Sequence, residues 1–394
     1  MAQLRELLTP AGLRLLDETP AVTTSADVAR EVMRLRGAGH APDLVSAVVG
    51  QARLRTRATE KFGPHARRML FTRAGLEQST RLAVAALHAG RLRDAGIERV
   101  ADLGSGIGGD ALGFAGIGMG VLAVDADEVT SAIAAYNLAP FGGRAQVRHA
   151  RAEDVDVSGV DAVWLDPARR TAGHGETSRL SRPEDYSPGL DWAFALAKEK
   201  PTGIKLGPGF DRGRLPLHGE AQWITADGST LELVLWSGSL ARPGVARAAL
   251  VLKDGRAHEL TAAADSEDEP VRALGGFIHE PAGSVIRARL VGEVARALEA
   301  GPVAPGIAYL TGDSALTSPF VSSFRVREQL PAEVKKLARA LRERGIGRLE
   351  IKKRGVDVDP AVLRTRLGLT GDSSATLLLT RVGSTRIAVL ADRV

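Results

Sequence analysis

The chain has 394 residues, a formal net charge of +5 at pH 7 and 44% hydrophobic residues. This composition is typical of a globular protein with two or three domains. The absence of cysteine excludes disulfides, thiolate metal sites and a cysteine nucleophile. The sequence shows no signal peptide and no apolar run near the ~18 residues of a membrane span, so we expect a cytoplasmic protein. The net positive charge alone does not decide whether the protein has an anionic partner.

Residues 1–70 predict a small helical subdomain. Leucines recur at helical spacing on either side of Thr9-Pro10, and Ser25 and Pro42 begin two further helices. We favour a packing module without direct chemistry here. Gln78, in a polar stretch that follows this region, is either a helix-capping group or a ligand contact.

Residues 71–265 predict an α/β domain. Short apolar runs alternate with helical segments, which indicates a parallel sheet with right-handed crossovers. The expected strands are residues 99–103, 121–124, 145–149, 162–165 and 203–206. Two later runs, residues 231–236 and 248–252, have no helix between them, and we expect them to pair antiparallel at the sheet edge.

Residues 280–394 predict a compact α+β domain, after an acidic loop at 265–270 that marks the boundary. A helix is expected over 284–298. The remaining expected elements are strands near 307–310 and 324–326, a helix over 331–344, a strand over 349–353, a helix over 360–367, and strands over 375–380 and 385–391.

The stretch Val100-Ala-Asp-Leu-Gly-Ser-Gly-Ile-Gly-Gly-Asp110 joins an apolar strand to a helix through a glycine-rich loop. Such a loop holds a nucleotide-like ligand at the carboxyl end of a strand. Its glycines match both the dinucleotide pattern and the D-x-G-x-G-x-G pattern of S-adenosylmethionine (SAM) enzymes. Glycine spacing alone therefore does not choose between the two ligands.

Of three acidic positions around the loop, two favour SAM over NAD. Asp102 would repel a pyrophosphate but suits the cationic amino acid part of SAM. Asp125 ends the next strand, where a carboxylate accepts hydrogen bonds from ribose hydroxyls in either ligand class. Glu153-Asp154 follows the third strand, where an acid would bind the adenine amino group. The residues predicted to hold the cofactor are Gln78, Asp102, Gly104, Gly106, Asp125, Ala126, Glu153 and Asp154.

Residues 97–251 resemble a class I SAM-dependent methyltransferase, and the loop Trp164-Leu-Asp-Pro-Ala-Arg-Arg170 after the fourth strand adds to this resemblance. The resemblance implies a Rossmann-like sheet with Asp166, Pro167 and Arg169 at the methyl acceptor. Asp166 would orient or deprotonate an acceptor N–H, and Arg169 would hold a phosphate or a base. A plain Asp-Pro turn is the alternative. The stacking aromatic of D-P-P-Y enzymes is missing.

Other side chains restrict the chemistry. Without a cysteine adduct, methylation at C5 of a pyrimidine is excluded, and a nitrogen or oxygen acceptor is expected. Lys205, after the fifth strand, points either to the site or along the strand flank. His149, His174 and His279 are isolated, so we expect no metal.

Residues 331–366 contain eleven Lys or Arg against five acids, which suits phosphates, although a solvated helix face is an equal alternative. The chain resembles bacterial methyltransferases with a THUMP-like C-terminal domain, through Phe71-Thr-Arg-Ala-Gly-Leu-Glu-Gln, the D-P-A-R-R loop and Arg348-Leu-Glu-Ile-Lys-Lys-Arg-Gly. THUMP domains are associated with RNA binding, so the resemblance implies methylation of a base nitrogen in structured RNA, either tRNA or rRNA. The expected RNA contacts are Lys335, Arg339, Lys352, Lys353 and Arg354. The alternatives are a small-molecule or protein acceptor, and a non-catalytic SAM- or RNA-binding module.

Overall fold

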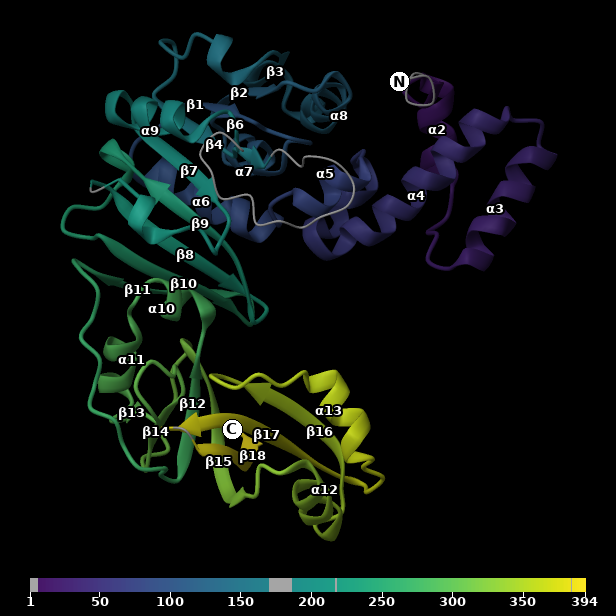
Figure 1. Ribbon diagram of the computed structural model, residues 1–394. Coiled ribbons are helices and arrows are strands. Elements are labelled where there is room, and N and C mark those ends of the chain that lie inside the picture. The colour runs from purple at the N-terminus through teal and green to yellow at the C-terminus, as the bar shows by residue number, and fades with distance from the viewer. Residues whose placement is uncertain (1–5, 170–185, 217, 384) are drawn as a thin grey trace. The chain divides into compact units, whose positions relative to one another are not determined.

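The computed structural model describes residues 6–169, 186–216, 218–383 and 385–394. The chain divides into two units (Figure 1). The first unit contains Met1–Leu206 and Trp236–Ala241, and the second contains Gly207–Leu235 and Arg242–Val394. No helix among the described residues is both long and apolar enough to cross a membrane.

The first unit begins with the predicted helical region. Helices α2 (Pro10–Glu18), α3 (Ser25–Gly37) and α4 (Pro42–Phe62) are followed by a 3₁₀ helix, η1 (Gly63–Arg68). Helix α3 starts with a capping box, because the Thr24 hydroxyl accepts from the Asp27 amide and the Asp27 carboxylate accepts from the Thr24 amide. The apolar core of these helices extends to Ile107 and Ile133 of the following α/β part.

Five parallel strands form the sheet of the first unit, in the order β7 (Thr202–Leu206), β4 (Ala162–Leu165), β1 (Arg99–Leu103), β2 (Gly120–Asp125) and β3 (Ala145–His149). The predicted strands and their parallel pairing are confirmed. Successive strands are added on one side of β1 and then on the other, and ligand sites open at such a switch point. The helices of this part are α5 (Arg73–Gln78), α6 (Leu82–Asp94), α7 (Gly109–Gly116), α8 (Glu128–Leu138) and α9 (Leu190–Glu199).

The second unit begins with two hairpins, β8 (Glu220–Ala226) with β9 (Ser229–Trp236), and β10 (Arg247–Lys253) with β11 (Arg256–Ala262). Strand β10 pairs with β8 in parallel and with β11 antiparallel. The expected antiparallel pairing of residues 231–236 with 248–252 is therefore wrong. Each hairpin turns at an Asp-Gly pair with positive φ, Asp227-Gly228 and Asp254-Gly255, which is the strongest local hairpin signal.

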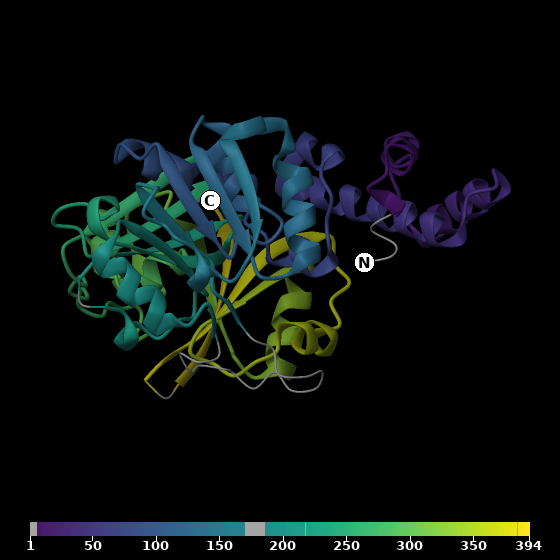
Figure 2. The ribbon, with the colours of Figure 1, turned by 90° about the horizontal axis from the view of Figure 1, so that it is seen from above.

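A seven-stranded sheet forms the rest of the second unit, in the order β13-β14-β12-β15-β18-β17-β16. In Figure 2 the yellow strands β17 and β18 lie side by side as an antiparallel hairpin. Two helices, α12 and α13, share a core with β16 and β17. The strands are β12 (Phe277–Pro281), β13 (Gly301–Pro302), β14 (Leu310–Gly312), β15 (Val321–Leu330), β16 (Ile346–Lys353), β17 (Ser373–Val382) and β18 (Thr385–Arg393), and the helices are α12 (Val334–Glu343) and α13 (Pro360–Leu367).

The single helix expected over 284–298 is wrong in one respect. The structure has two short helices there, α10 (Gly283–Arg287) and α11 (Val291–Ala297). Arg289 between them has φ +61°, a left-handed conformation that a continuous α-helix does not allow. Apolar residues keep helical spacing on both sides of Arg289, so periodicity does not reveal this break.

Candidate active site

The glycine loop follows β1 and leads into α7. Gly104 has φ +89°, and a Cβ at this position would lie 2.8 Å from the carbonyl oxygen of Asp166. Only glycine allows both this backbone conformation and this close approach. Gly106 is different, because a Cβ there would meet no atom within 4 Å. The loop is therefore tight against the end of β4 on one side and open on the other.

Asp102 lies beneath this loop, one residue before the end of β1. Its side chain is 1% exposed, and neither carboxylate oxygen has a hydrogen-bond partner among the described residues. Burial, with the negative charges of Asp110 and Asp166, raises the pKa of Asp102 well above its ordinary value. A buried carboxylate without partners is costly, and a cationic ligand would compensate it.

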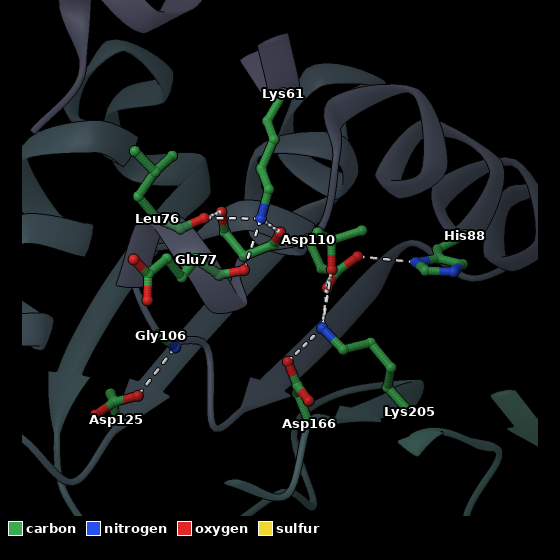
Figure 3. A network of polar contacts seen from close by, with 11 residues as sticks. Lys61, Leu76, Glu77, His88, Gly106, Asp110, Asp125, Asp166 and Lys205 are labelled. Atoms are coloured by element: carbon green, nitrogen blue, oxygen red, sulfur yellow. Dashed lines mark hydrogen bonds and ion pairs between the residues drawn. The ribbon is translucent and has the colours of Figure 1, made fainter. Parts of the chain in front are cut away.

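Asp125 ends β2 and shapes the same loop. Its carboxylate accepts hydrogen bonds from the amides of Gly106 and Asp127, both at 2.9 Å. Burial raises the pKa of Asp125, although these two hydrogen bonds oppose the shift. Figure 3 shows the contact between Asp125 and Gly106.

The remaining predicted cofactor residues lie at strand and helix ends in the same unit. The carbonyl oxygen of Ala126 is 3.1 Å from Nε2 of His149. Glu153 and the exposed Asp154 form a 3₁₀ turn after β3, and Glu153 pairs with Arg151 at 3.2 Å. Gln78 is exposed at the last residue of α5.

Lys205, at the end of β7, is the centre of a polar network that the sequence did not reveal (Figure 3). Its ammonium forms an ion pair with Oδ2 of Asp166 and lies 3.7 Å from Oδ2 of Asp110. The Lys205 side chain is 11% exposed, so water competes little for these contacts. It also donates to the Thr80 hydroxyl at 2.9 Å. The open choice for Lys205 is thus resolved, since its side chain contacts Asp166.

Asp110, in the first turn of α7, anchors this network. It accepts hydrogen bonds from Thr80 at 2.7 Å and from Nδ1 of His88 at 2.8 Å. Burial alone would raise the pKa of Asp110, but Lys205, His88 and Thr80 lower it to about 2. Because the ionised carboxylate only accepts, His88 must carry its proton on Nδ1. The His88 ring also lies 4.5 Å from the Trp164 ring of β4.

Lys61, near the end of α4, holds the end of α5, which leads to Thr80 of this network. Its ammonium donates to the carbonyl oxygens of Leu76, Glu77 and Ser79 at 2.7–2.8 Å. These carbonyls belong to the end of α5, where unpaired carbonyls attract a cation. Burial, followed by the charges of Arg81 and Lys205, lowers the pKa of Lys61.

Two buried amides hold the segment before α5 in place. Asn137 of α8 donates to the carbonyls of Leu70 and Ile107 and accepts from the Leu70 amide. Gln51 of α4 makes the equivalent pair of bonds to the backbone of Phe71. Of these two amides, only Asn137 also binds the glycine loop, because Ile107 belongs to that loop.

The acceptor-side predictions lie at the end of β4. Asp166 is 35% exposed, and Pro167 beside it is buried. The backbone of Arg169 pairs with Tyr186, between the short strands β5 (Ala168–Arg169) and β6 (Tyr186–Ser187). The side chain of Arg169, the whole of Arg170 and His174 lie outside the described residues.

The predicted RNA contacts lie in the second unit, and the structure divides them into two groups. Lys352 pairs with Glu280 at 2.7 Å and lies over the Phe324 ring, and Arg354 approaches Glu280 at 3.6 Å and lies over Tyr309. The other three, Lys335, Arg339 and Lys353, are exposed. Of these, Arg339 lies 3.7 Å from Glu343. No group of three or more His, Cys, Asp or Glu side chains that could hold a metal occurs in the described part of the chain.

Comparisons with known proteins agree with this geometry. The sequence family described as THUMP domain-like matches residues 321–393, and a domain of unknown function matches residues 1–58. Two curated relatives, from Mycobacterium tuberculosis strains H37Rv and CDC 1551, are each named an uncharacterized S-adenosylmethionine-dependent methyltransferase. Each is 35% identical over 361 residues, covering 89% of this chain and 96% of the relative.

A solved structure shows the same fold over almost the whole chain. It is that of a Porphyromonas gingivalis W83 protein assigned as a methyltransferase. It matches with a TM-score of 0.71 and 18% identity, covering 94% of this chain and 99% of the other. From the identity and coverage of the curated relatives, together with the glycine loop and its acids, this chain belongs to the S-adenosylmethionine-dependent methyltransferases and carries a THUMP-like domain at its C-terminus.

Proposed function

We propose that this methyltransferase acts on a base nitrogen of structured RNA, either tRNA or rRNA. The observation that carries the proposal is the placement of Asp166 directly after β4, where its backbone carbonyl lies against Gly104 and its carboxylate pairs with Lys205. A partly exposed carboxylate at this place can accept a hydrogen bond from an acceptor N–H. The THUMP-like match over 321–393 supports RNA as the molecule that carries this nitrogen.

The residues around the glycine loop fit the cofactor of the family. Asp102 is a buried carboxylate without a partner among the described residues, and it suits the cationic amino group of SAM. The open space beside Gly106 leaves room for a ligand against the backbone. Asp125 would bind the ribose hydroxyls. The adenine would be contacted by Glu153 and Asp154, and Gln78 and Ala126 would border the same ligand.

SAM supplies a methyl group on a sulfonium, which is a good leaving group, so the protein mainly has to align the acceptor. Asp166 would orient the acceptor N–H and take the proton that the nitrogen loses. Lys205 and the buried Asp110 behind it would hold the carboxylate in place. Arg169 would contact a phosphate or the acceptor base. C5 of a pyrimidine is excluded because the chain has no cysteine.

A small-molecule or protein acceptor is the second candidate, and one observation favours it. Lys352 and Arg354 are held by Glu280 and by aromatic rings, as expected if this part of the C-terminal domain serves for packing. Under this alternative the protein would still transfer a methyl group, but purified RNA would not be its acceptor.

Nucleoside mass spectrometry of total RNA from a deletion strain tests the proposal. We expect one methylated nucleoside to be missing, to return with the wild-type gene and to stay missing with Asp166→Ala. Purified Asp166→Ala protein should still bind SAM, which separates an enzyme from a non-catalytic binding module. An unchanged set of methylated nucleosides would overturn the RNA proposal and favour the second candidate.

A further inference from the structure

A basic segment lies next to the site in the first unit, outside the C-terminal domain. Between residues 53 and 73 the chain has seven Lys or Arg and one acid, Glu60. We infer that the exposed arginines of this segment bind the phosphate backbone of the acceptor RNA. The inference rests on the proposed function and deepens it, because it assigns an RNA surface to a region expected to serve only for packing.

Two of the seven basic side chains point inward and give the segment its shape. Arg55 donates to the carbonyl of Met69 at 2.9 Å and pairs with Asp17 at 2.8 Å. Lys61 binds the carbonyls at the end of α5, as described above. The other five are exposed, and we call them the segment arginines: Arg53, Arg57, Arg67, Arg68 and Arg73.

The segment arginines are poorly neutralised. Glu77 is the acid that reaches them among the described residues, at 3.3 Å from Arg73 and 3.9 Å from Arg57, and these side chains are 81% and 52% exposed. Glu60 pairs instead with Arg81 at 3.4 Å. Five positive charges with one shared carboxylate repel one another. The phosphates of an RNA would relieve this repulsion, and the arginines would release the cations condensed on that RNA.

Helix α3 provides an internal comparison. There Arg30 pairs with Asp27 and Arg34 pairs with Glu31, each three residues away on the same helix. The chain thus neutralises these two exposed arginines with local acids, as is usual for a solvated helix face. Among the segment arginines that the structure describes, only Arg73 has such a partner, Glu77 on the same helix, so most of their charge is left for a phosphate-binding surface.

The segment is fixed to the site through α5 and the residues that follow it, all within one unit. Arg73 begins α5, and Gly75 of this helix lies against Ile107, since a Cβ on Gly75 would be 2.5 Å from Cγ2 of that residue. The end of α5 leads directly to Thr80, which binds both Asp110 and Lys205. A phosphate held by Arg73 would therefore have a defined position relative to Asp166. A guanidinium group suits this task because it can donate two parallel hydrogen bonds to two oxygens of one phosphate.

The test measures RNA affinity against salt for three full-length proteins. The probes are unfractionated bacterial tRNA and purified rRNA, with fluorescence anisotropy as the readout. The proteins are wild type, a variant with all five segment arginines changed to Ala, and the matched control Arg30→Ala/Arg34→Ala. We expect the variant that lacks all five arginines to bind RNA at least about tenfold more weakly than wild type. The slope of log affinity against log salt concentration should fall by about 1 for each phosphate contact removed.

The control should bind within about twofold of wild type, because its arginines are neutralised already. SAM binding and the thermal midpoint of each variant show whether the fold is intact. If the variant that lacks all five arginines does not fold, Arg67→Ala/Arg68→Ala should still weaken RNA binding. If wild type binds and methylates RNA and these variants bind equally well, the inference is wrong while the proposed function stands. If wild type itself binds no RNA, both are overturned.

Discussion

The ammonium of Lys205 and the carboxylate of Asp166 form an ion pair at the carboxyl ends of the neighbouring strands β7 and β4. The same ammonium is 2.9 Å from the Thr80 hydroxyl and 3.7 Å from Asp110. One lysine thus connects a partly exposed carboxylate to a buried one. This relationship fixes the orientation of Asp166 before any acceptor arrives.

We predict that Lys205→Met lowers kcat for methyl transfer by about 10²-fold, because a misplaced Asp166 no longer aligns the acceptor. Lys205→Arg, which keeps the charge, should recover part of the activity. Steady-state methyl transfer with SAM in excess measures both effects. Lys198→Met is the matched control, since Lys198 is exposed on α9. Equal kcat for Lys205→Met and Lys198→Met would contradict the role of Lys205.

Asp102→Asn should stabilise the free protein at neutral pH and weaken SAM binding. Burial raises the pKa of Asp102, so the folded state keeps a proton that the unfolded state loses above its ordinary pKa of 3.8. The wild type therefore loses stability as pH rises from about 4, and the uncharged Asn does not. Urea unfolding at several pH values should show the advantage of Asp102→Asn growing with pH. An advantage that does not change with pH would contradict this account.

SAM binding should release a proton from Asp102. A cationic ligand favours the ionised carboxylate, so binding releases a proton at every pH at which the raised pKa keeps Asp102 protonated in the free protein. Titration calorimetry in buffers with different ionisation enthalpies measures this release. It should be absent from Asp102→Asn, and SAM affinity of the wild type should increase with pH.

The features that sequence could predict are local ones. Asp102, Asp125 and the glycines lie within 24 residues, and their positions follow from strand ends and a loop. The Lys205 network could not be predicted, because Thr80 is 30 residues from Asp110 and 125 from Lys205, and only tertiary packing brings them together. His88 lies in an alanine-rich helix with no neighbouring polar motif. The Asp-Gly hairpin turns, in contrast, are local signals that the sequence contains.

The contacts of Asp110 with Lys205, His88 and Thr80 predict a local effect of acid. The pKa of Asp110 in the folded protein is about 2, below the ordinary 3.8, so its contribution to stability is complete above about pH 4 and is lost as pH falls towards 2. Asp110→Asn should therefore increase hydrogen exchange in α6 and α7 at pH 7 relative to wild type. The difference should disappear near pH 2. A constant difference would mean that charge is not the cause.

Lys352 and Lys353 are adjacent but differ in environment, and their alanine variants should differ as well. Lys352 pairs with Glu280 at 2.7 Å and is 21% exposed, whereas Lys353 is exposed. We expect Lys352→Ala to lower the stability of the second unit by about 1–3 kcal/mol, because Glu280 loses a charged partner. Lys353→Ala should leave stability within about 0.5 kcal/mol of wild type. Urea unfolding measures both, and equal effects would contradict the structural role of Lys352.

Asn137 and Gln51 form a matched pair for testing how the glycine loop is held. Each amide side chain binds both backbone groups of one residue, Leu70 or Phe71. Truncation to Ala should cost about 1–3 kcal/mol for every buried group left without a partner, so both variants should be destabilised.

Only Asn137 also donates to the carbonyl of Ile107, at 2.9 Å. Asn137→Ala should therefore weaken SAM binding beyond its effect on stability, because the loop between Gly104 and Gly108 loses the hydrogen bond at Ile107. Gln51→Ala should lose comparable stability with SAM affinity close to wild type. Calorimetric SAM affinity at a temperature where both variants are folded separates the two effects. If Gln51→Ala weakened SAM binding as much as Asn137→Ala, the bond to Ile107 would not be what positions the loop.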